Sequence, residues 1–199
     1  MSEAYLHPMA LVETENIGVG TYVWAFAHIM KDVTIGNNCN IGDHVFIESN
    51  VRVGNGVTIK NGVSVWEGVQ IDDFSFIGPN VAFTNDRFPR SPRLDDAKSR
   101  YGGKSWLSPT IVSEGVSIGA NATILCGLTL GKYCVVGAGS VVTRDVPPYR
   151  LVYGCPARMN GYVNKRGEGL KQVGDHFVQP VSGKHYLLYN DAEMRELTP

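Results

Sequence analysis

The sequence lacks any long hydrophobic run, and no stretch approaches the length of a membrane-spanning helix. Its first residues, MSEAYLHPMA, do not have the pattern of a secretory signal peptide, so we expect a cytoplasmic protein. Basic residues are not in excess either: the net charge is −1 over 199 residues, which does not favour nucleic acid as a partner. These absences favour a soluble, globular protein of one domain with, at most, a small appendage.

Cysteine is also scarce. The four cysteines show no CxxC spacing and no pattern of metal ligands, so we expect no metal. We expect each of them to be a small buried or half-buried residue and not a disulfide partner. They are Cys39, Cys126, Cys134 and Cys155.

What the sequence does have is a six-residue repeat. One apolar column comprises Leu11, Ile17, Val23, Ile29, Ile35, Ile41, Ile47, Val53, Ile59, Val65, Ile71, Ile77 and Phe83, and it resumes at Val112, Ile118, Ile124, Leu130, Val136 and Val142. A second column of small, mostly β-branched residues follows four positions later, from Val33 to Val81 and from Val116 to Val146. A period of six fits neither an α-helix nor a lone alternating strand, but it is typical of the hexapeptide β-helix.

Each hexad is expected to form one short strand and a corner, so that three hexads close one triangular coil. The large aliphatic side chain points into the prism, and Gly and Asn allow the left-handed backbone of the corners. The predicted fold is an all-β parallel β-helix over residues 1–159. Residues 160–199 lose the repeat and are expected to form a C-terminal cap or tail.

The repeat is interrupted after Phe83. The 29 positions from Phe83 to Val112 are not a multiple of six, so residues 84–110 are expected to leave the prism as an inserted loop. A loop of this length is usually functional or disordered, and its residues Tyr101 and Trp106 argue against disorder because aromatic rings pack on a surface. Aromatic residues predicted on the outer faces favour oligomerisation, and a triangular prism packs readily as a cyclic trimer. These residues are Phe46, Trp66, Phe74 and Phe76.

Three segments carry a resemblance to a known family: VFIESNVRVGNGVTIKNGVSVWEGV, AFTNDRFPRS and ATILCGLTLGKYCVVGAGSVVTRDVPPYRLVYGCPAR. They resemble the left-handed β-helix acyltransferases, and within these the bacterial N-acetyltransferases that act on nucleotide-linked 3-amino sugars, over residues 5–165. The resemblance implies left-handed coils, acetyl-CoA as the donor and a UDP- or dTDP-linked amino sugar as the acceptor. It also implies a homotrimer with sites at the subunit interfaces, and a role in surface polysaccharide, such as lipopolysaccharide, synthesis.

The implied reaction is attack of an amine on a thioester. A sugar amine with a pKa of roughly 8 is partly neutral at pH 7, so the site must mainly orient the amine and stabilise the oxyanion. In the resembled family the Asn of FTN lies beside the reactive amine, which corresponds to Asn85; alternatively, Asn85 and Asp86 only begin a turn. Asp86 is a candidate to accept the proton or to orient a water.

Four further residues are candidates for substrate binding. Arg87 and Arg90 have the charge to bind phosphates or sugar hydroxyls, although isolated arginines in a charged loop are usually solvated. Phe83 lies in the FTN motif, and Glu67 has a carboxylate for a hydroxyl or an ammonium group.

For CoA, the coil of three hexads places Ala120 and Ala138 one above the other at a corner. With Gly137 beside them, such small residues leave backbone N–H groups accessible to a pantetheine arm, although Gly and Ala also suit any corner. Arg144 and Arg158 place positive charge near the last coil, where CoA phosphates need it. In GCPAR, which resembles the family's GxPAR turn, Pro156 is a candidate to lie against the adenine.

Three other readings remain open. A sugar O-acetyltransferase would depend on His28 or His44 as a base, whereas such residues are more often packed on the surface. An enzyme of the γ-carbonic anhydrase type shares the solenoid but needs about three converging histidines. A purely structural solenoid does not explain the insertion.

In the tail, QPVSGKHYLLY predicts a hairpin with a turn at Ser182 and Gly183, and DAEMREL predicts a short helical end.

Overall fold

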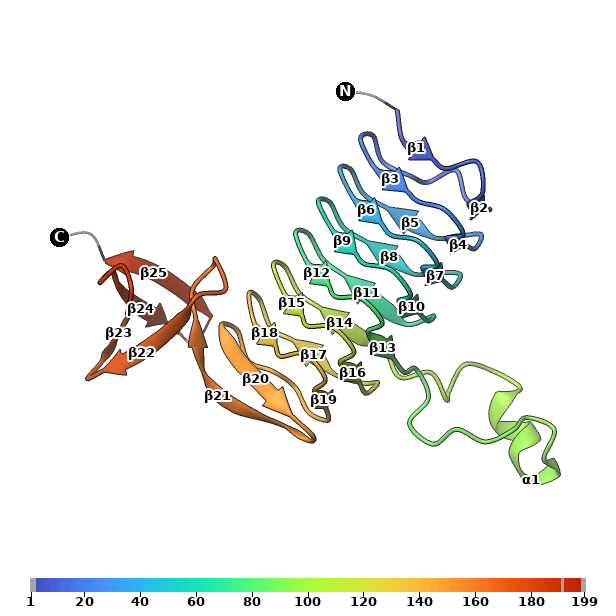
Figure 1. Cartoon of the computed structure of the whole chain (residues 1–199). Coiled ribbons are helices and arrows are strands. Elements are labelled where there is room, and N and C mark those ends of the chain that lie inside the picture. Colours follow the sequence, from blue (N-terminus) through green and yellow to red (C-terminus); the bar gives the residue numbers. More distant parts are fainter. Residues whose placement is uncertain (1–2, 191, 198–199) are drawn as a thin grey trace.

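The hexads form a prism of three parallel sheets (Figure 1). This computed structural model describes residues 3–190 and 192–197. Very short strands alternate with turns, and from the second coil of the prism to its last, every third strand along the chain belongs to the same sheet. The fold is a left-handed parallel β-helix, which confirms the predicted fold class.

The prism strands fall into three stacks. The first sheet begins with β1 (Tyr5–Leu6), β3 (Tyr22–Val23), β6 (Asn40–Ile41), β9 (Thr58–Ile59), β12 (Phe76–Ile77), β15 (Ser117–Ile118) and β18 (Val135–Val136). The second contains β2 (Leu11–Val12), β4 (His28–Ile29), β7 (Phe46–Ile47), β10 (Ser64–Val65), β13 (Ala82–Phe83), β16 (Thr123–Ile124) and β19 (Val141–Val142). The third contains β5 (Thr34–Ile35), β8 (Arg52–Val53), β11 (Val69–Ile71), β14 (Thr110–Val112) and β17 (Thr129–Leu130).

The register of the strands confirms that three hexads make one coil: Tyr22 pairs with Asn40, and Asn40 pairs with Thr58. The inward aliphatic residues of successive coils stack in one continuous core, and Ile41, Ile59 and Ile77 are fully buried. Their burial supplies most of the driving force for folding, because apolar area removed from water stabilises in proportion to its size.

The first coil departs from the predicted column. Leu11 is 55% exposed and pairs with the outward-facing His28, so its predicted inward position is wrong. Val12 pairs with the buried Ile29 and packs against the core in its place. The chain from Leu11 to its partner His28 is therefore one position shorter than three hexads. Because side chains alternate along a strand, this shift by one position turns Leu11 outward and Val12 inward.

One corner shows why Gly recurs there. Asn38, Gly56, Phe74, Gly115 and Tyr133 stack at successive coils, and all have φ between 55° and 69°. A Cβ on Gly56 would lie 2.7 Å from the ring of Phe74, and one on Gly115 would lie 2.4 Å from the ring of Tyr133. Glycine thus supplies the left-handed backbone and leaves space for the aromatic ring of the next coil.

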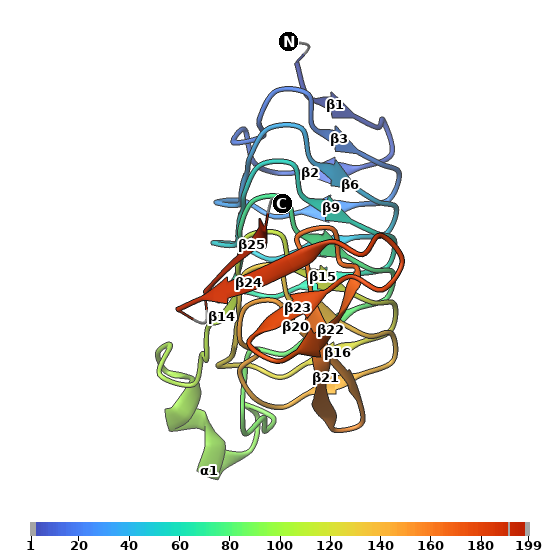
Figure 2. The ribbon, with the colours of Figure 1, turned by 90° about the vertical axis from the view of Figure 1, so that its left-hand side faces the viewer.

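The insertion comprises residues 84–109, between β13 and β14, and projects from the prism (Figures 1 and 2). It contains the short helix α1 (Asp95–Lys98) and the 3₁₀ turn η1 (Ser99–Tyr101). Beyond it the coils resume, so that Phe76 of β12 pairs with Ser117 of β15. We expected the excursion to run to residue 110, whereas Thr110 already belongs to β14.

The C-terminal region continues the first sheet instead of forming another coil. Its strands are β20 (Arg150–Gly154), β21 (Ala157–Val163), β22 (Gly169–Val173), β23 (His176–Val178), β24 (His185–Tyr189) and β25 (Glu193–Leu197). β20 still pairs in parallel with β18, and each later strand is antiparallel to the one before it. Val152 and Ala157 are buried against the prism core, whereas β22–β25 lie beside the prism (Figure 1). β21 crosses position 160, where we expected the tail to begin.

The C-terminal strands have a small core of their own, in which Tyr149, Phe177, Tyr186 and Met194 are buried. The hairpin turn predicted at Ser182 and Gly183 is present between β23 and β24. The helical end predicted for DAEMREL is wrong, and residue 191 lies outside the described residues. Residues 193–197 form β25, because pairing along the whole of β24 and burial of Met194 outweigh the local preference for helix.

All four cysteines are free, as predicted. Cys39, Cys126 and Cys134 are buried, but Cys155 is exposed, so the expectation of burial is wrong for that residue. Burial raises the pKa of the Cys134 thiol to about 12. In the part of the chain that the structure describes, no helix is long and apolar enough to cross a membrane.

Tyr133 links the prism to the C-terminal strands and has a testable pH dependence. The hydrogen bond from its hydroxyl to Glu114, together with burial, raises its pKa to about 12. Because the folded pKa exceeds the ordinary value of about 10, the stabilisation is complete below pH ~10 and is lost as the pH rises towards 12. The difference in free energy of unfolding between wild type and Tyr133→Phe should therefore shrink between urea titrations at about pH 9 and about pH 11. A difference that grows with pH would contradict the assignment.

Candidate active site

The candidate site begins where the chain leaves the prism, at the corner between the second and third sheets. Asn85 stacks directly beside Glu67 of the preceding coil, and its Nδ2 donates a hydrogen bond to the Glu67 carbonyl oxygen at 3.3 Å. The carbonyl oxygen of Asn85 accepts the N–H of Ser108 from the returning chain at 2.9 Å. No hydrogen bond from a described residue reaches its Oδ1. The side chain is therefore held by its nitrogen, with its oxygen available to a ligand.

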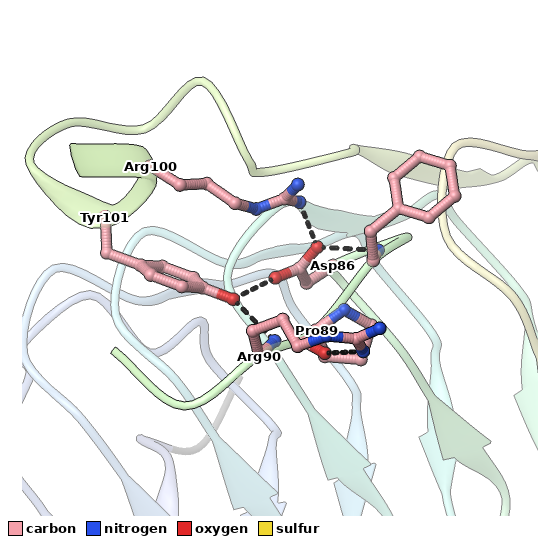
Figure 3. Close-up of polar contacts among 6 residues, drawn as sticks. Asp86, Pro89, Arg90, Arg100 and Tyr101 are labelled. Carbon is pink, nitrogen blue, oxygen red and sulfur yellow. Dashed lines mark hydrogen bonds and ion pairs between the residues drawn. The ribbon is translucent and has the colours of Figure 1, made fainter. Parts of the chain in front are cut away.

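Asp86 lies at the centre of a polar network inside the insertion (Figure 3). Its carboxylate accepts hydrogen bonds from the Tyr101 hydroxyl at 2.8 Å, from the Phe88 N–H at 2.9 Å and from the Arg100 guanidinium. Burial alone would raise the pKa of Asp86, but these donors outweigh it and lower the pKa below its ordinary value. The group is therefore ionised at neutral pH and is a weak base.

Glu67 is similarly occupied. Its carboxylate pairs with Lys104 from the far end of the insertion and accepts a hydrogen bond from Asn50 Nδ2 at 2.8 Å. Its backbone N–H donates to Glu48 at 2.7 Å. Glu67 thus joins the returning arm of the insertion to the prism, beside Asn85.

Two cavities lie along the same edge of the prism. One, of about 240 Å³, is under the insertion and is lined by Thr84, Asp86, Arg87, Pro89, Leu125, Cys126, Leu128 and Thr143. The other, of about 250 Å³, is at the last coil and is lined by Val142, Thr143, Arg144, Asp145, Val146, Val152, Ala157, Arg158 and Met159. Thr143 lines both, so the two cavities adjoin. Together their lining residues extend from the insertion to strands β20 and β21.

A single corner column connects these cavities. The strand register places Glu67, Asn85, Cys126 and Arg144 in four consecutive coils. At about 4.8 Å per coil, Arg144 lies roughly 10 Å along the prism from Asn85. The structure thus brings together Asn85 and Arg87 at one end and Arg144 and Arg158 at the other. Neither Arg144 nor Arg158 forms an ion pair with a described residue, and the one hydrogen bond of the Arg158 guanidinium goes to the Ala157 carbonyl oxygen at 3.0 Å. The positive charge of both groups is therefore not neutralised by a described carboxylate, as a phosphate site requires.

Other predicted residues lie elsewhere. Ala120, Gly137 and Ala138 stack at the corner between the first and second sheets, across the second sheet from Arg144. Pro156 is exposed in the turn between β20 and β21, next to the cavity that Arg158 lines.

The structure contradicts the predicted role of Phe83. Its side chain is 2% exposed and belongs to the prism core, so the prediction that it binds substrate is wrong. It is the last inward residue before the insertion. Arg90 is exposed, and its guanidinium folds back onto the Pro89 carbonyl oxygen at 2.9 Å.

His28 and His44 are not close to the insertion. His28 faces outward on β4, three coils and roughly 14 Å from Ala82 of β13, and its Nε2 lies 2.7 Å from Glu13 Oε1. His44 stacks on Phe26, with ring centroids 4.9 Å apart. In a cyclic assembly whose symmetry axis runs parallel to the prism, the same coil of each protomer lies at the same level along that axis. Such an assembly therefore does not bring His28 of one protomer to the insertion of another. No group of three or more potential metal ligands occurs among residues 3–190 and 192–197.

Sequence reasoning missed Arg100, Tyr101, Lys104 and Thr143 as members of the site. The sequence indicates for Tyr101 only an aromatic ring that needs a packing surface, and the ring packs on Trp106, with ring centroids 5.7 Å apart. The insertion has no repeat, so nothing in the sequence indicated which of its residues meet.

The coiled prism, with an arm over a corner groove, is the architecture of a hexapeptide-repeat transferase. The profile of the bacterial transferase hexapeptide (six repeats) matches residues 16–49 and 109–144. The dTDP-3-amino-3,6-dideoxy-alpha-D-galactopyranose 3-N-acetyltransferase of Aneurinibacillus thermoaerophilus is 50% identical over 193 residues, covering 97% of this chain and 95% of that protein. This chain therefore belongs to the family of hexapeptide-repeat sugar N-acetyltransferases, as the sequence motifs indicated.

Solved structures agree with this assignment. A hexapeptide-repeat acetyltransferase from Vibrio cholerae O1 biovar eltor, complexed with acetyl coenzyme A, is 30% identical; the match covers 63% of this chain and 68% of that one, with a TM-score of 0.53. A galactoside acetyltransferase in complex with coenzyme A is 25% identical over 75% of this chain and 66% of that one, with a TM-score of 0.54.

Proposed function

We propose that this protein transfers the acetyl group of acetyl-CoA to the amino group of a dTDP- or UDP-linked 3-amino sugar. The observation that carries the proposal is the side chain of Asn85, which is anchored through Nδ2 and leaves Oδ1 to accept a hydrogen bond from an amine. The relative with 50% identity, a dTDP-3-amino-sugar N-acetyltransferase, supports the dTDP-linked class of acceptor.

In the proposed reaction, the neutral amine attacks the thioester carbonyl carbon. A C–N bond forms, the C–S bond breaks, one proton leaves the nitrogen, and the products are an amide and the CoA thiol. Asn85 Oδ1 orients the amine so that its lone pair faces the thioester, which converts an encounter between two reactants into a positioned one. Because the carboxylate of Asp86 is held by three donors, we do not assign it the role of general base.

We propose that the two adjoining cavities receive the two reactants. The cavity beside Arg87 is proposed to receive the sugar and the acetyl end of the thioester. The cavity beside Arg144 and Arg158 is proposed to receive the CoA phosphates, because charge-assisted hydrogen bonds to phosphate are strong. Pro156 borders this end, next to where the adenine would leave the groove.

We further propose a cytoplasmic homotrimer. Aromatic side chains on the prism faces are exposed: Trp66 by 36%, Phe76 by 43% and Phe74 by 65%. Within one protomer, Arg144 lies at a different corner of the prism from the small residues Ala120 and Ala138. A cleft between two protomers can combine both corners around one CoA molecule, and closed symmetry gives three equal clefts.

The function is tested by measuring thiol release from acetyl-CoA with a panel of UDP- and dTDP-linked amino sugars. We expect release with a dTDP-linked 3-amino sugar, and none with the matching sugar that carries a hydroxyl group at C3. Release with the hydroxyl sugar alone would instead indicate O-acetyl transfer. The close pairing of His28 with Glu13 is the observation in favour of that second function, because a carboxylate orients a histidine base. The reactants would then meet beside β4, roughly 14 Å from the insertion, and not in the cavities near Asn85. His28→Ala would then abolish transfer to the hydroxyl sugar.

A further inference from the structure

The insertion has almost no hydrophobic core. From residue 86 to residue 104, Ala97 is the one buried apolar residue in the described structure. A segment of this length that buries so little apolar surface is not expected to hold a single conformation by packing alone, because fixing each residue costs conformational entropy. Something else must order it.

The polar network around Asp86 provides that order. Asp86 lies at the start of the insertion, and its carboxylate binds the side chains of Arg100 and Tyr101. These two residues lie 14 and 15 positions further along the chain, at the end of the helical turn. The Tyr101 hydroxyl donates to Asp86 and accepts the Arg90 N–H at 2.9 Å, so it connects two parts of the outgoing chain (Figure 3). Phe88 donates its N–H to the same carboxylate at 2.9 Å.

These contacts leave little of the carboxylate for a substrate. Its side chain is 9% exposed, one oxygen accepts from Arg100 and Phe88, and the other accepts from Tyr101. Asp86 is also the direct neighbour of Asn85, and residue 86 pairs with Leu107 in an antiparallel bridge at the base of the insertion. A change in the network therefore moves the backbone from which the Asn85 side chain extends.

We propose that Asp86, Arg100 and Tyr101 are positioning residues, which hold Asn85 and the adjoining sugar cavity in the geometry that acetyl transfer needs. This inference rests on the proposed function. Asp86 lines the sugar cavity, but both oxygens of its carboxylate are held by the network, and Arg100 and Tyr101 are not among the lining residues. The three residues act through Asn85 and through Arg87, which lies between two residues of the network and lines the cavity.

The first test is Tyr101→Phe, which removes one oxygen and with it two hydrogen bonds. The matched control is Tyr189→Phe in β24, which removes the same atom from an exposed side chain of the C-terminal strands. Tyr101→Phe should speed hydrogen exchange in residues 86–101 without affecting the coils, and should lower kcat/KM for the amino-sugar nucleotide by roughly 10- to 100-fold. The KM for acetyl-CoA should stay within about twofold, since that end of the groove is remote.

Two further variants separate positioning from direct catalysis. Arg100→Lys keeps the charge and should retain more activity than Arg100→Met, which loses both charge and hydrogen bonds. Asp86→Asn should lower kcat but keep the shape of the pH–rate profile, because the proton acceptor is not this residue. Loss of the acid limb of that profile would show that Asp86 is the base and would overturn the proposal.

The results also distinguish this proposal from the proposed function. If wild type transfers acetyl groups and Tyr101→Phe matches Tyr189→Phe in both exchange and kcat/KM, the positioning role alone is overturned. If wild type transfers no acetyl group to any amino sugar of the panel, the proposed function fails, and the positioning role falls with it.

Discussion

Replacement of Asn85 by Ala is expected to lower kcat by about 100-fold or more while leaving the assembly intact. The side chain supplies the oriented oxygen that we assign to the amine, and loss of one positioned hydrogen-bonding group in an active site typically costs that much. The backbone contact of Asn85 with Ser108 does not depend on the side chain, so the base of the insertion should remain folded. Steady-state thiol release and the sedimentation profile of the variant measure the two effects.

A suitable control is Asn55→Ala at another corner of the prism, where the side chain bonds to Asp73 of the next coil. It removes the same groups far from the insertion, and its kcat should equal that of wild type. An Asn85→Ala variant that turns over as fast as the control would remove Asn85 from the mechanism. The amine would then have to be oriented by a different group, such as one that lines the cavity beside Asn85.

The second large effect is expected from the double variant Arg144→Ala/Arg158→Ala. Each guanidinium lines the cavity at the last coil, and a hydrogen bond to a charged group contributes about 1.5–3 kcal/mol. The KM for acetyl-CoA should therefore rise by on the order of 100-fold, with a much smaller change in the KM for the amino-sugar nucleotide. Initial rates at varied acetyl-CoA concentrations measure the change.

Arg52→Ala is the matched control for this variant, because Arg52 is an exposed outward residue of β8 on the third sheet. Higher salt should weaken acetyl-CoA binding in wild type and in Arg52→Ala, and much less in the double variant, because screening acts on charges that are present. An unchanged KM in the double variant would place the CoA phosphates elsewhere.

The insertion shows the limit of reading a site from sequence. Its position after Phe83 was predictable, because an excursion out of a strict period is visible as a change of phase. The pairing of Asp86 with Arg100 and Tyr101 was not, because no period links residues that far apart in an irregular segment. The same reason explains why Lys104 was missed as the partner of Glu67.

Phe83 and Met194 show two different errors. Phe83 lies within a motif that pointed to substrate, yet it also continues the inward column, and burial decided its role. Met194 belongs to a segment with local helical preference, but pairing with β24 placed it in a strand. In both cases a contact with distant residues outweighed the local signal.

The sequence by itself determined the prism. A period of six specifies the triangular coil, the inward aliphatic core and the segment that is excluded from it, because each hexad forms one short strand followed by one corner. Only the tertiary structure decided the site. Stacking across the insertion puts Asn85 and Arg144 in one column, and folding of the insertion onto Asp86 sets the geometry at its base, since both depend on contacts between residues that no local pattern connects.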